Sequence, residues 1–245
     1  MIVNQVNEGW EIFSHSSHGL LAGKIANEIE DQYKCNNWAA TLTAIIEHDD
    51  RQLHFTEKNY LTDLGTPRDF LLEKRKVGEI TERSNRLLRQ AEDKSIWVAM
   101  LIIHHLQFIY KDVAKEKKTL ATYLDTLESK KRTYMKCYGL TQTDVQKMYQ
   151  LMVFADRCSL ILCQNAIPAM QRSLEINHSI NNKTYWIREK ENGTVQIDPW
   201  IFKNEQFSVT AEYKLLAQPS FGSNKEFESL LNKSDVKIRE WVIAK

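Results

Sequence analysis

Residues 38–50 read Trp-Ala-Ala-Thr-Leu-Thr-Ala-Ile-Ile-Glu-His-Asp-Asp, and this stretch decides how the rest of the chain is interpreted. Its apolar residues recur at the spacing of one buried helix face, and Asp49 extends that face. An unpaired carboxylate is costly to bury, so Asp49 needs a cation, an arginine or several hydrogen-bond donors. Imidazole nitrogens and carboxylate oxygens are the usual protein ligands of divalent metals. The ending Glu47-His48-Asp49-Asp50 therefore indicates a metal site, and the plainer alternative is a helix end that enters a polar loop.

Further metal-ligand residues stand on other apolar helix faces. His18 begins the face that continues with Leu21 and Ile25, and Asp156 follows Met152 by four residues on the inner face of a late helix. The simpler explanations are a hydrogen-bonded core histidine and, for Asp156, a salt bridge to a distant basic residue. His15 lies one turn before His18 and is the alternative ligand.

The pair His104-His105 lies inside the segment 95–110, which is apolar on nearly every side and predicts a central buried helix. Successive side chains on a helix point about 100° apart, so at most one of the two rings faces a common site. His105 is the first choice and His104 the second.

The composition narrows the class of protein. The 245 residues include 33 basic and 32 acidic side chains, a net charge of +1, which gives no reason to expect nucleic acid or an anionic membrane as partner. The four cysteines form no Cys-x-x-Cys pair and are expected to be reduced. The N-terminus lacks the pattern of a signal peptide, and the longest apolar run, 96–103, is far shorter than the roughly 20 residues that a membrane span needs. We therefore expect a cytoplasmic protein.

The distribution of glycine separates a helical part of the chain from the rest. Seven of the eight glycines lie outside residues 80–180, which favours long helices within that range. Residues 1–180 are therefore expected to form a helical metal-binding body, preceded by a short strand near 10–13. Residues 181–245 are expected to form a β-rich subdomain packed on that body, with a hairpin around Asn192-Gly193. The fold prediction is mostly α, a helical bundle with a small C-terminal antiparallel sheet. A homodimer through an edge strand of that sheet is a further expectation.

A loop of about 51–69 separates the His-Asp stretch from the next helix. It is long for a connection within a compact domain, and such loops are often functional lids. Arg68, beside Pro67, is the residue of this loop that we expect to meet an anionic substrate, although an ordinary loop position is the plainer account.

The order of these residues along the chain resembles the HD superfamily of metal-dependent phosphohydrolases. In that family a helical core holds a cation through a first histidine, a His-Asp doublet and a distant helical aspartate. The corresponding residues here are His18, His48, Asp49 and Asp156, and divergent members add a histidine that His105 or His104 would supply.

A narrower resemblance extends over nearly the whole chain, to a bacterial domain-of-unknown-function family placed with the HD clan. That family often has Asp-Asp-Gly-Trp after the histidine, where this chain has Asp49-Asp50-Arg51-Gln52. The departure leaves the presumed ligands intact and alters positions that border the presumed pocket. The segments that carry the resemblance are 17–23, 47–50, 64–67, 156–160 and 198–202.

The resemblance implies a divalent metal ion, of which Mn, Fe, Ni, Co, Zn and Mg are candidates, and hydrolysis of a phosphate ester or nucleotide, so the expected partner is a small phosphorylated molecule. Asp49 would bridge metal and water, and Glu47 or Asp50 would orient the ligands or accept a proton. Arg51, Arg68 or Arg157 would neutralise charge on the phosphate. The alternative is a non-catalytic metal-binding or ligand-binding regulatory module of the same fold.

Overall fold

The structure is a computed structural model that describes residues 1–73 and 75–245. The helices are α1 (His15–Asn27), α2 (Trp38–Glu47), α3 (Val77–Lys94), α4 (Ile96–Glu116), α5 (Lys118–Cys137), α6 (Gln142–Cys163) and α7 (Asn224–Lys233), with short 3₁₀ turns η1 (Asp31–Tyr33), η2 (Phe70–Leu72) and η3 (Ile180–Asn182). The strands are β1 (Ile2–Val6), β2 (Gly9–Phe13), β3 (Leu174–His178), β4 (Thr184–Glu189), β5 (Val195–Asp198), β6 (Gln206–Leu216) and β7 (Val236–Ala244).

One sheet of seven strands, in the order β1-β2-β6-β7-β5-β4-β3, overturns the prediction of a mostly α bundle with a small C-terminal antiparallel sheet. The fold is α+β, and the sheet is mixed because β5 pairs with β7 in parallel. The prediction was wrong because β2 finds its partner about 200 residues later, where Trp10 pairs with Leu216 of β6. Such a long-range pairing leaves no local sequence signal. Strands β1 and β3 were also missed.

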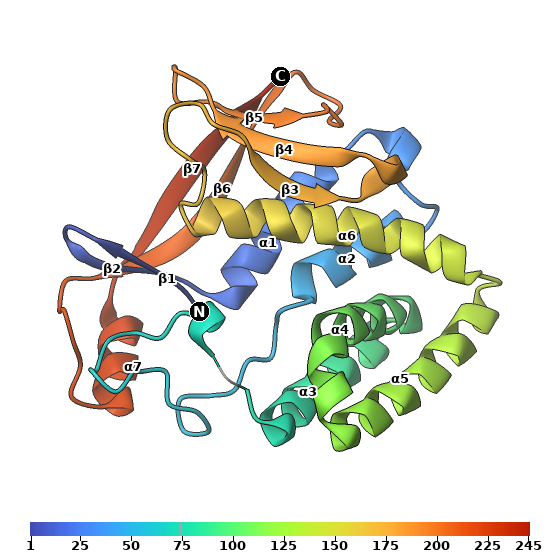
Figure 1. The fold of residues 1–245 in the computed structure, drawn as a ribbon, viewed down its shortest axis with the longest axis horizontal. Helices are drawn as coiled ribbons and strands as arrows, with labels where there is room; N and C mark the ends of the chain where they lie inside the picture. The colour runs from blue at the N-terminus through green and yellow to red at the C-terminus, as the bar shows by residue number, and fades with distance from the viewer. Residues whose placement is uncertain (74) are drawn as a thin grey trace.

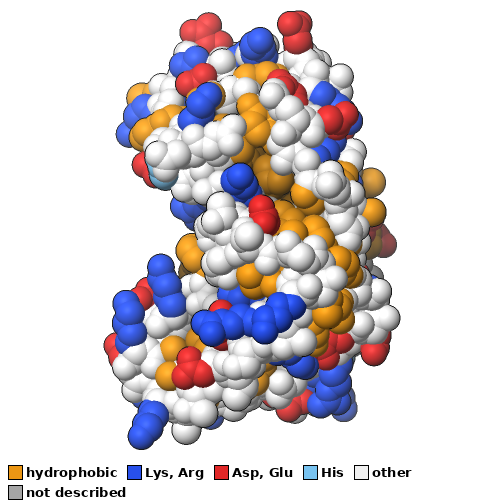
Figure 2. All heavy atoms as spheres, turned by 90° about the vertical axis from the view of Figure 1, so that its right-hand side faces the viewer, with side chains coloured by type: hydrophobic (Ala, Val, Ile, Leu, Met, Phe, Trp, Pro, Cys, Tyr) orange, Lys and Arg blue, Asp and Glu red, His pale blue; other side chains and the backbone are white. Residues whose placement is uncertain are grey.

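Helix α6 crosses the middle of the molecule, with β3, β4 and β5 on one side and α3, α4 and α5 on the other (Figure 1). One buried core joins α1 and α6 to the inner face of the sheet, and a second lies among α3, α4, α5 and the start of α6. In profile the molecule is notched between the part that carries the sheet and the part that carries these helices (Figure 2). The division at residue 180 stays a prediction, although the N-terminal hairpin pairs with the C-terminal strand β6.

Local sequence explains where the helices begin. Ser14, Ser95 and Thr141 each accept a hydrogen bond from a backbone N–H of the first turn of α1, α4 and α6, as N-cap residues do. The predicted hairpin also forms, since β4 and β5 are antiparallel neighbours and Gly193 takes the left-handed conformation in their turn. No helix of the described residues has the length and apolar character that a membrane crossing requires.

Two glycines let α1 approach α2 closely. A Cβ atom on Gly19 would lie 2.2 Å from the carbonyl oxygen of Ile46, and one on Gly23 would lie 2.3 Å from the Ile46 side chain. A side chain at Gly19 would require displacement of the α2 backbone, and one at Gly23 would require the Ile46 side chain to move. Because His18 precedes Gly19 and His48 follows Ile46 by two residues, this close approach brings the two histidines together.

The long connection between α2 and α3 is anchored to the C-terminal part of the chain. The Asn224 side chain donates to the carbonyl oxygen of Lys58 at 2.9 Å and accepts from the backbone N–H of Tyr60 at the same distance. Tyr60 and Leu61 are buried beside Phe221 and Phe227. A lid movement of the whole loop would therefore break a small apolar core.

Replacing Gly19 by alanine should destabilise the protein by about 1–3 kcal/mol, because a methyl group is forced against a backbone oxygen. Thermal unfolding of the G19A protein should show the loss as a lower Tm. Gly78→Ala is the matched control, since a Cβ at Gly78 in α3 meets no atom within 4 Å. A Tm of G19A equal to that of G78A would contradict the tight α1–α2 contact.

Candidate functional site

Four helices meet at the candidate site. It is formed by His15 and His18 from the first turn of α1, His48 and Asp49 directly after α2, His105 from the middle of α4 and Asp156 from the middle of α6. The His15, His18, His48 and His105 side chains are buried, whereas the carboxylates of Asp49 and Asp156 are 19% and 15% exposed. The centre is therefore enclosed by imidazoles, and its most exposed side chains are the two carboxylates.

The tautomer of neutral His48 is fixed by its own helix. Its Nδ1 lies 2.7 Å from the carbonyl oxygen of Ile45, which can only accept a hydrogen bond. Nδ1 therefore carries a proton, and in the neutral ring Nε2 carries the free electron pair. That Nε2 faces Asp156 Oδ1 at 3.2 Å.

The tautomer of neutral His18 is fixed by Ser159. The Ser159 hydroxyl donates its only proton to the carbonyl oxygen of Asp156 at 2.8 Å, so it accepts from His18 Nδ1 over 2.8 Å. The electron pair of His18 is again on Nε2, 3.1 Å from the same Asp156 Oδ1. Among the described residues this buried Nε2 has no hydrogen-bond partner of suitable geometry.

Two imidazole electron pairs and a carboxylate oxygen thus point at one another. Donor atoms that share one cation at a distance of about 2.1 Å are themselves separated by about 3.0–3.4 Å in octahedral or tetrahedral arrangement. The observed separations of 3.1 and 3.2 Å match this spacing. His18, His48 and Asp49 also offer ligand atoms that all lie within 4.8 Å of one another. The residues present therefore fit a divalent metal ion with nitrogen and oxygen ligands.

Asp49 is held from both sides. His15 Nδ1 lies 3.0 Å from its Oδ2, and the buried Arg83 of α3 donates from Nη2 to its Oδ1 at 2.9 Å. Arg83 also donates to the carbonyl oxygen of His48 at 3.3 Å. These contacts orient the carboxylate toward His18, whose Nε2 is 3.9 Å from Oδ2.

The charges of the centre follow from these contacts. Burial lowers the pKa of His15 to about 3, so its ring is neutral and Nδ1–H donates to Asp49. Burial opposes the charged form of His48, but the adjacent Asp156 carboxylate outweighs it and raises the pKa of His48 to about 9. Burial likewise acts to raise the pKa of Asp49, while His15 and Arg83 hold it well below its ordinary value. In the absence of metal a proton on His48 therefore bridges to Asp156.

Of the two neighbouring histidines on α4, the structure turns His105 toward the centre. The His105 ring lies 4.9 Å from that of His48, centroid to centroid, and its Nδ1 is 3.2 Å from the Tyr149 hydroxyl. Burial lowers the pKa of His105 to about 3, so it is neutral. His104 points away, with its ring nitrogens 3.2 Å from Gln146 Oε1 and 3.4 Å from Lys131 Nζ.

The other predicted catalytic residues, Glu47, Asp50 and Arg68, have hydrogen-bond or ion-pair partners outside the ligand set. Glu47 forms an ion pair with Lys94, and Asp50 accepts from Ser16 Oγ at 2.6 Å. Arg68 donates to the carbonyl oxygen of Leu61 at 2.7 Å, and Arg51 donates to Gln90. Their catalytic roles stay predictions.

Sequence reasoning missed Arg83, Ser159 and Tyr149. Arg83 follows Ile80 by three residues and precedes Leu87 by four, so it is a charge on an apolar helix face, the kind of signal that marked Asp156. Ser159 and Tyr149 lie on the same helix as Asp156, at i+3 and i−7, and share its buried side. Their roles depend on which residues of other helices lie opposite.

A comparison with protein-family models matches residues 1–218 to the family described as "Protein of unknown function (DUF3891)". The chain belongs to the DUF3891 family. The matched range contains every residue of the centre and all strands except β7. No curated protein and no solved structure matches the chain.

The raised pKa of His48 makes the stability of the metal-free protein depend on pH. An unfolded histidine has a pKa of about 6.5, so the favourable charge on folded His48 stabilises fully below that pH, and this stabilisation is lost as the pH rises through about 9. The Tm difference between wild type and His48→Gln, measured with a chelator, should therefore shrink between pH 6 and pH 9.

His105→Gln is the control, because the pKa of His105 is lowered to about 3 and the ring stays neutral across that range in the folded state. Its Tm difference from wild type should not vary between pH 7.5 and pH 9. A wild-type to His48→Gln difference that is also constant would contradict the His48–Asp156 ion pair.

Proposed function

We propose that this DUF3891 protein is a metal-dependent hydrolase of phosphate esters, of the HD type. The observation that carries the proposal is the convergence of His18 Nε2 and His48 Nε2 on Asp156 Oδ1, with both tautomers fixed by groups behind the rings. A carbonyl or hydroxyl that holds the far nitrogen of a histidine is a recurrent arrangement behind metal ligands.

His18, His48, Asp49 and Asp156 would hold the ion, which supplies a water of lowered pKa and polarises a phosphoryl oxygen. Asp49 is positioned by Arg83 and His15, so its free electron pairs keep a fixed direction. His15 is neutral and donates to Asp49 through Nδ1, so it would help to keep Asp49 an ionised carboxylate.

Arg75 would contribute positive charge toward a bound phosphate. Arg75 donates to the Tyr110 hydroxyl at 3.0 Å and to Glu73 at the same distance. Burial acts to lower its pKa, but Tyr110, Glu73 and Asp49 raise it, which places its charge within electrostatic reach of Asp49. A positive charge at this position would stabilise an anion held at the carboxylate side of the centre.

One observation favours a second candidate, a non-catalytic ligand-binding module. Both oxygens of Asp49 already have protein partners, His15 and Arg83, so this carboxylate is satisfied without a metal. In that case the centre would serve stability or regulation, and the bound ion or ligand would not be turned over.

Metal binding is the first test. Mn²⁺ titrated into chelator-treated protein should bind near one equivalent per chain, and Asp156→Asn should weaken binding by at least about tenfold, as the loss of metal-site groups commonly does. His104→Gln is the matched control, because this ring lies one residue from His105 and faces away. Equal affinities of wild type and Asp156→Asn would contradict the proposed ligand set.

Turnover decides between the two candidates. The metal-loaded protein should hydrolyse at least one member of a panel of nucleotides and phosphomonoesters, and His48→Gln should lose that activity while His104→Gln keeps it. Saturation with metal but no turnover on the panel with Mn, Mg, Fe, Co, Ni or Zn would favour the binding module.

A further inference from the structure

His105 differs from His18 and His48 in the group that contacts its Nδ1. In His18 and His48 this nitrogen carries a proton that an oxygen accepts, so each ring leaves the electron pair of Nε2 free. The Nδ1 of His105 lies 3.2 Å from the hydroxyl of Tyr149, a group that can either donate or accept. The direction of this hydrogen bond decides whether Nε2 of His105 offers an electron pair or a proton to the centre.

The hydroxyl of Tyr149 is the donor of this hydrogen bond. The side chain is buried, and burial raises its pKa, so the hydroxyl keeps its proton. Within residues 1–73 and 75–245 that hydroxyl has one hydrogen-bond partner, His105 Nδ1. If His105 donated instead, the proton of Tyr149 would be buried without an acceptor, which disfavours that tautomer by roughly tenfold. The neutral ring of His105 therefore accepts at Nδ1 and carries its proton on Nε2.

The surroundings of the His105 ring favour the same tautomer. Tyr149 occupies its Nδ1 edge, which leaves the Nε2 edge for groups of the centre. Burial lowers the pKa of this ring to about 3, and the carboxylates of Asp156 and Asp49 act against that effect, so both are near enough to interact with the ring. Negative charge nearby favours an N–H at the facing edge over an electron pair.

The charges of the centre favour an anion once a divalent ion is bound. The carboxylates of Asp49 and Asp156 balance the two charges of the ion. Arg83 adds a positive charge that is 2% exposed, and it donates to Asp49 at 2.9 Å. A buried net charge is costly unless an opposite charge lies beside it. An anion bound at the ion would supply that charge, and its oxygens would need hydrogen-bond donors.

We propose that His105 is a substrate-binding residue of this centre, which donates from Nε2 to an oxygen of an anionic phosphate ester and is not a ligand of the metal. The inference rests on the proposed function, because the ion is what would hold the ester beside His105. A donor fixed in advance by Tyr149 stabilises negative charge on that oxygen without having to reorient. Coordination of the ion by Nε2 would instead require the proton to move to Nδ1 and leave the hydroxyl of Tyr149 unpaired.

Metal affinity distinguishes a donor from a ligand. His105→Phe keeps a planar ring and removes both nitrogens, so its affinity for Mn²⁺ should stay within about twofold of wild type, whereas loss of a group that holds the metal commonly costs about tenfold or more. His104→Phe is the matched control, because His104 is the neighbouring residue and contacts Gln146 and Lys131. Calorimetry on chelator-treated protein gives the affinities, and the Tm shows whether each variant is folded. A loss of Mn²⁺ affinity of that larger size in folded His105→Phe alone would overturn the inference.

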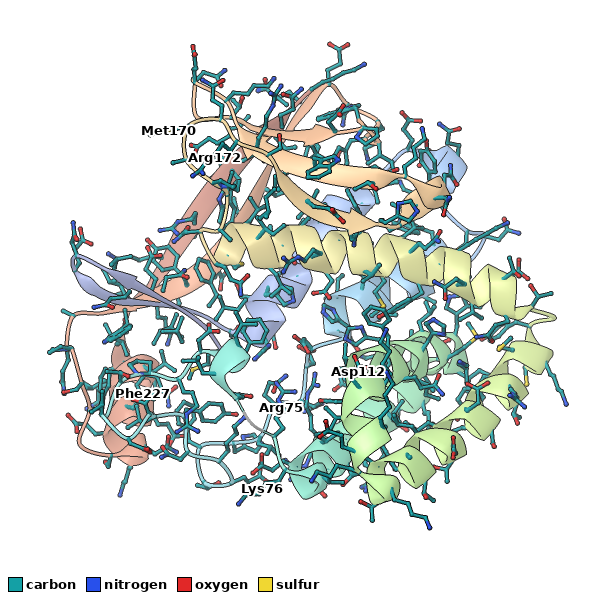
Figure 3. All side chains as sticks on the ribbon, in the orientation of Figure 1. Arg75, Lys76, Asp112, Met170, Arg172 and Phe227 are labelled. Carbon is teal, nitrogen blue, oxygen red and sulfur yellow. The ribbon has the colours of Figure 1, made fainter. Side chains whose placement is uncertain are left out.

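Phosphate affinity measures the donated hydrogen bond. Inorganic phosphate titrated into the Mn²⁺-loaded protein should bind about tenfold more weakly to His105→Phe than to wild type, because a hydrogen bond to a charged group is lost. His104→Phe should bind it as wild type does. Arg75 is the alternative partner of the anion; it lies on the connection before α3 and donates to Tyr110 of α4 at 3.0 Å (Figure 3). A loss of phosphate affinity in Arg75→Gln with none in His105→Phe would overturn the inference.

The tautomer itself can be observed without removing His105. Nitrogen NMR of isotope-labelled, metal-free protein should find the His105 proton on Nε2. A proton on Nδ1 would overturn the inference, and this measurement holds even if His105→Phe does not fold. In Tyr149→Phe the preference for Nε2 should weaken, because the donor to Nδ1 is gone.

These outcomes separate the inference from the proposed hydrolysis. If His105→Phe binds Mn²⁺ normally and phosphate weakly, but wild type turns over no ester, the inference stands and the hydrolase proposal fails. Turnover by a protein whose His105→Phe variant loses its metal would support the hydrolase and overturn the inference. No Mn²⁺ binding by wild type would overturn both.

Discussion

The structure depends on the meeting of two imidazole nitrogens with one carboxylate oxygen at the junction of four helices. His18 and His48 have their Nδ1 protons committed to Ser159 and to the Ile45 carbonyl, so both Nε2 atoms face Asp156 Oδ1. Electron pairs at this separation repel unless a proton or a cation lies among them. The apo protein supplies a proton on His48, and the proposed holo protein a divalent metal.

Much of the surrounding architecture keeps this junction in place. Gly19 and Gly23 allow α1 to approach Ile46, and Arg83 fixes both the Asp49 carboxylate and the backbone at the end of α2. Helix α6 carries Asp156 and Ser159 and packs against α1 on one side and β3 on the other. The sheet therefore acts as the support of the helices that carry the residues of the centre, although it contributes no side chain to the centre.

The sequence predicted the helices better than it predicted the sheet. Helical periodicity is local, so the faces that bear His18 and Asp156 are visible within a window of one helix, and a buried charge on such a face is informative. The Asn192-Gly193 turn is equally local, and that hairpin was predicted correctly. The pairing of β2 with β6 joins residues about 200 positions apart, and neither strand specifies the other.

The residues that contact the side chains of the centre from other elements were missed for the same reason. Arg83 is recognisable as a buried charge, but its partner Asp49 lies on another helix. Glu47, Asp50 and Arg68 were chosen for their nearness in sequence to the His-Asp doublet, whereas their side chains contact Lys94, Ser16 and Leu61. Nearness in sequence identifies residues that share one helix face. It does not identify charged residues that come together from different elements.

The proposed metal site is tested most directly by anomalous diffraction from a crystal of the protein grown or soaked with Mn²⁺. A metal ion bound at the proposed site should give one strong anomalous peak within about 2.0–2.3 Å of both His18 Nε2 and His48 Nε2, with Asp156 as an oxygen ligand. A fully occupied peak away from these atoms, or none at a Mn²⁺ concentration that saturates binding in solution, would contradict it.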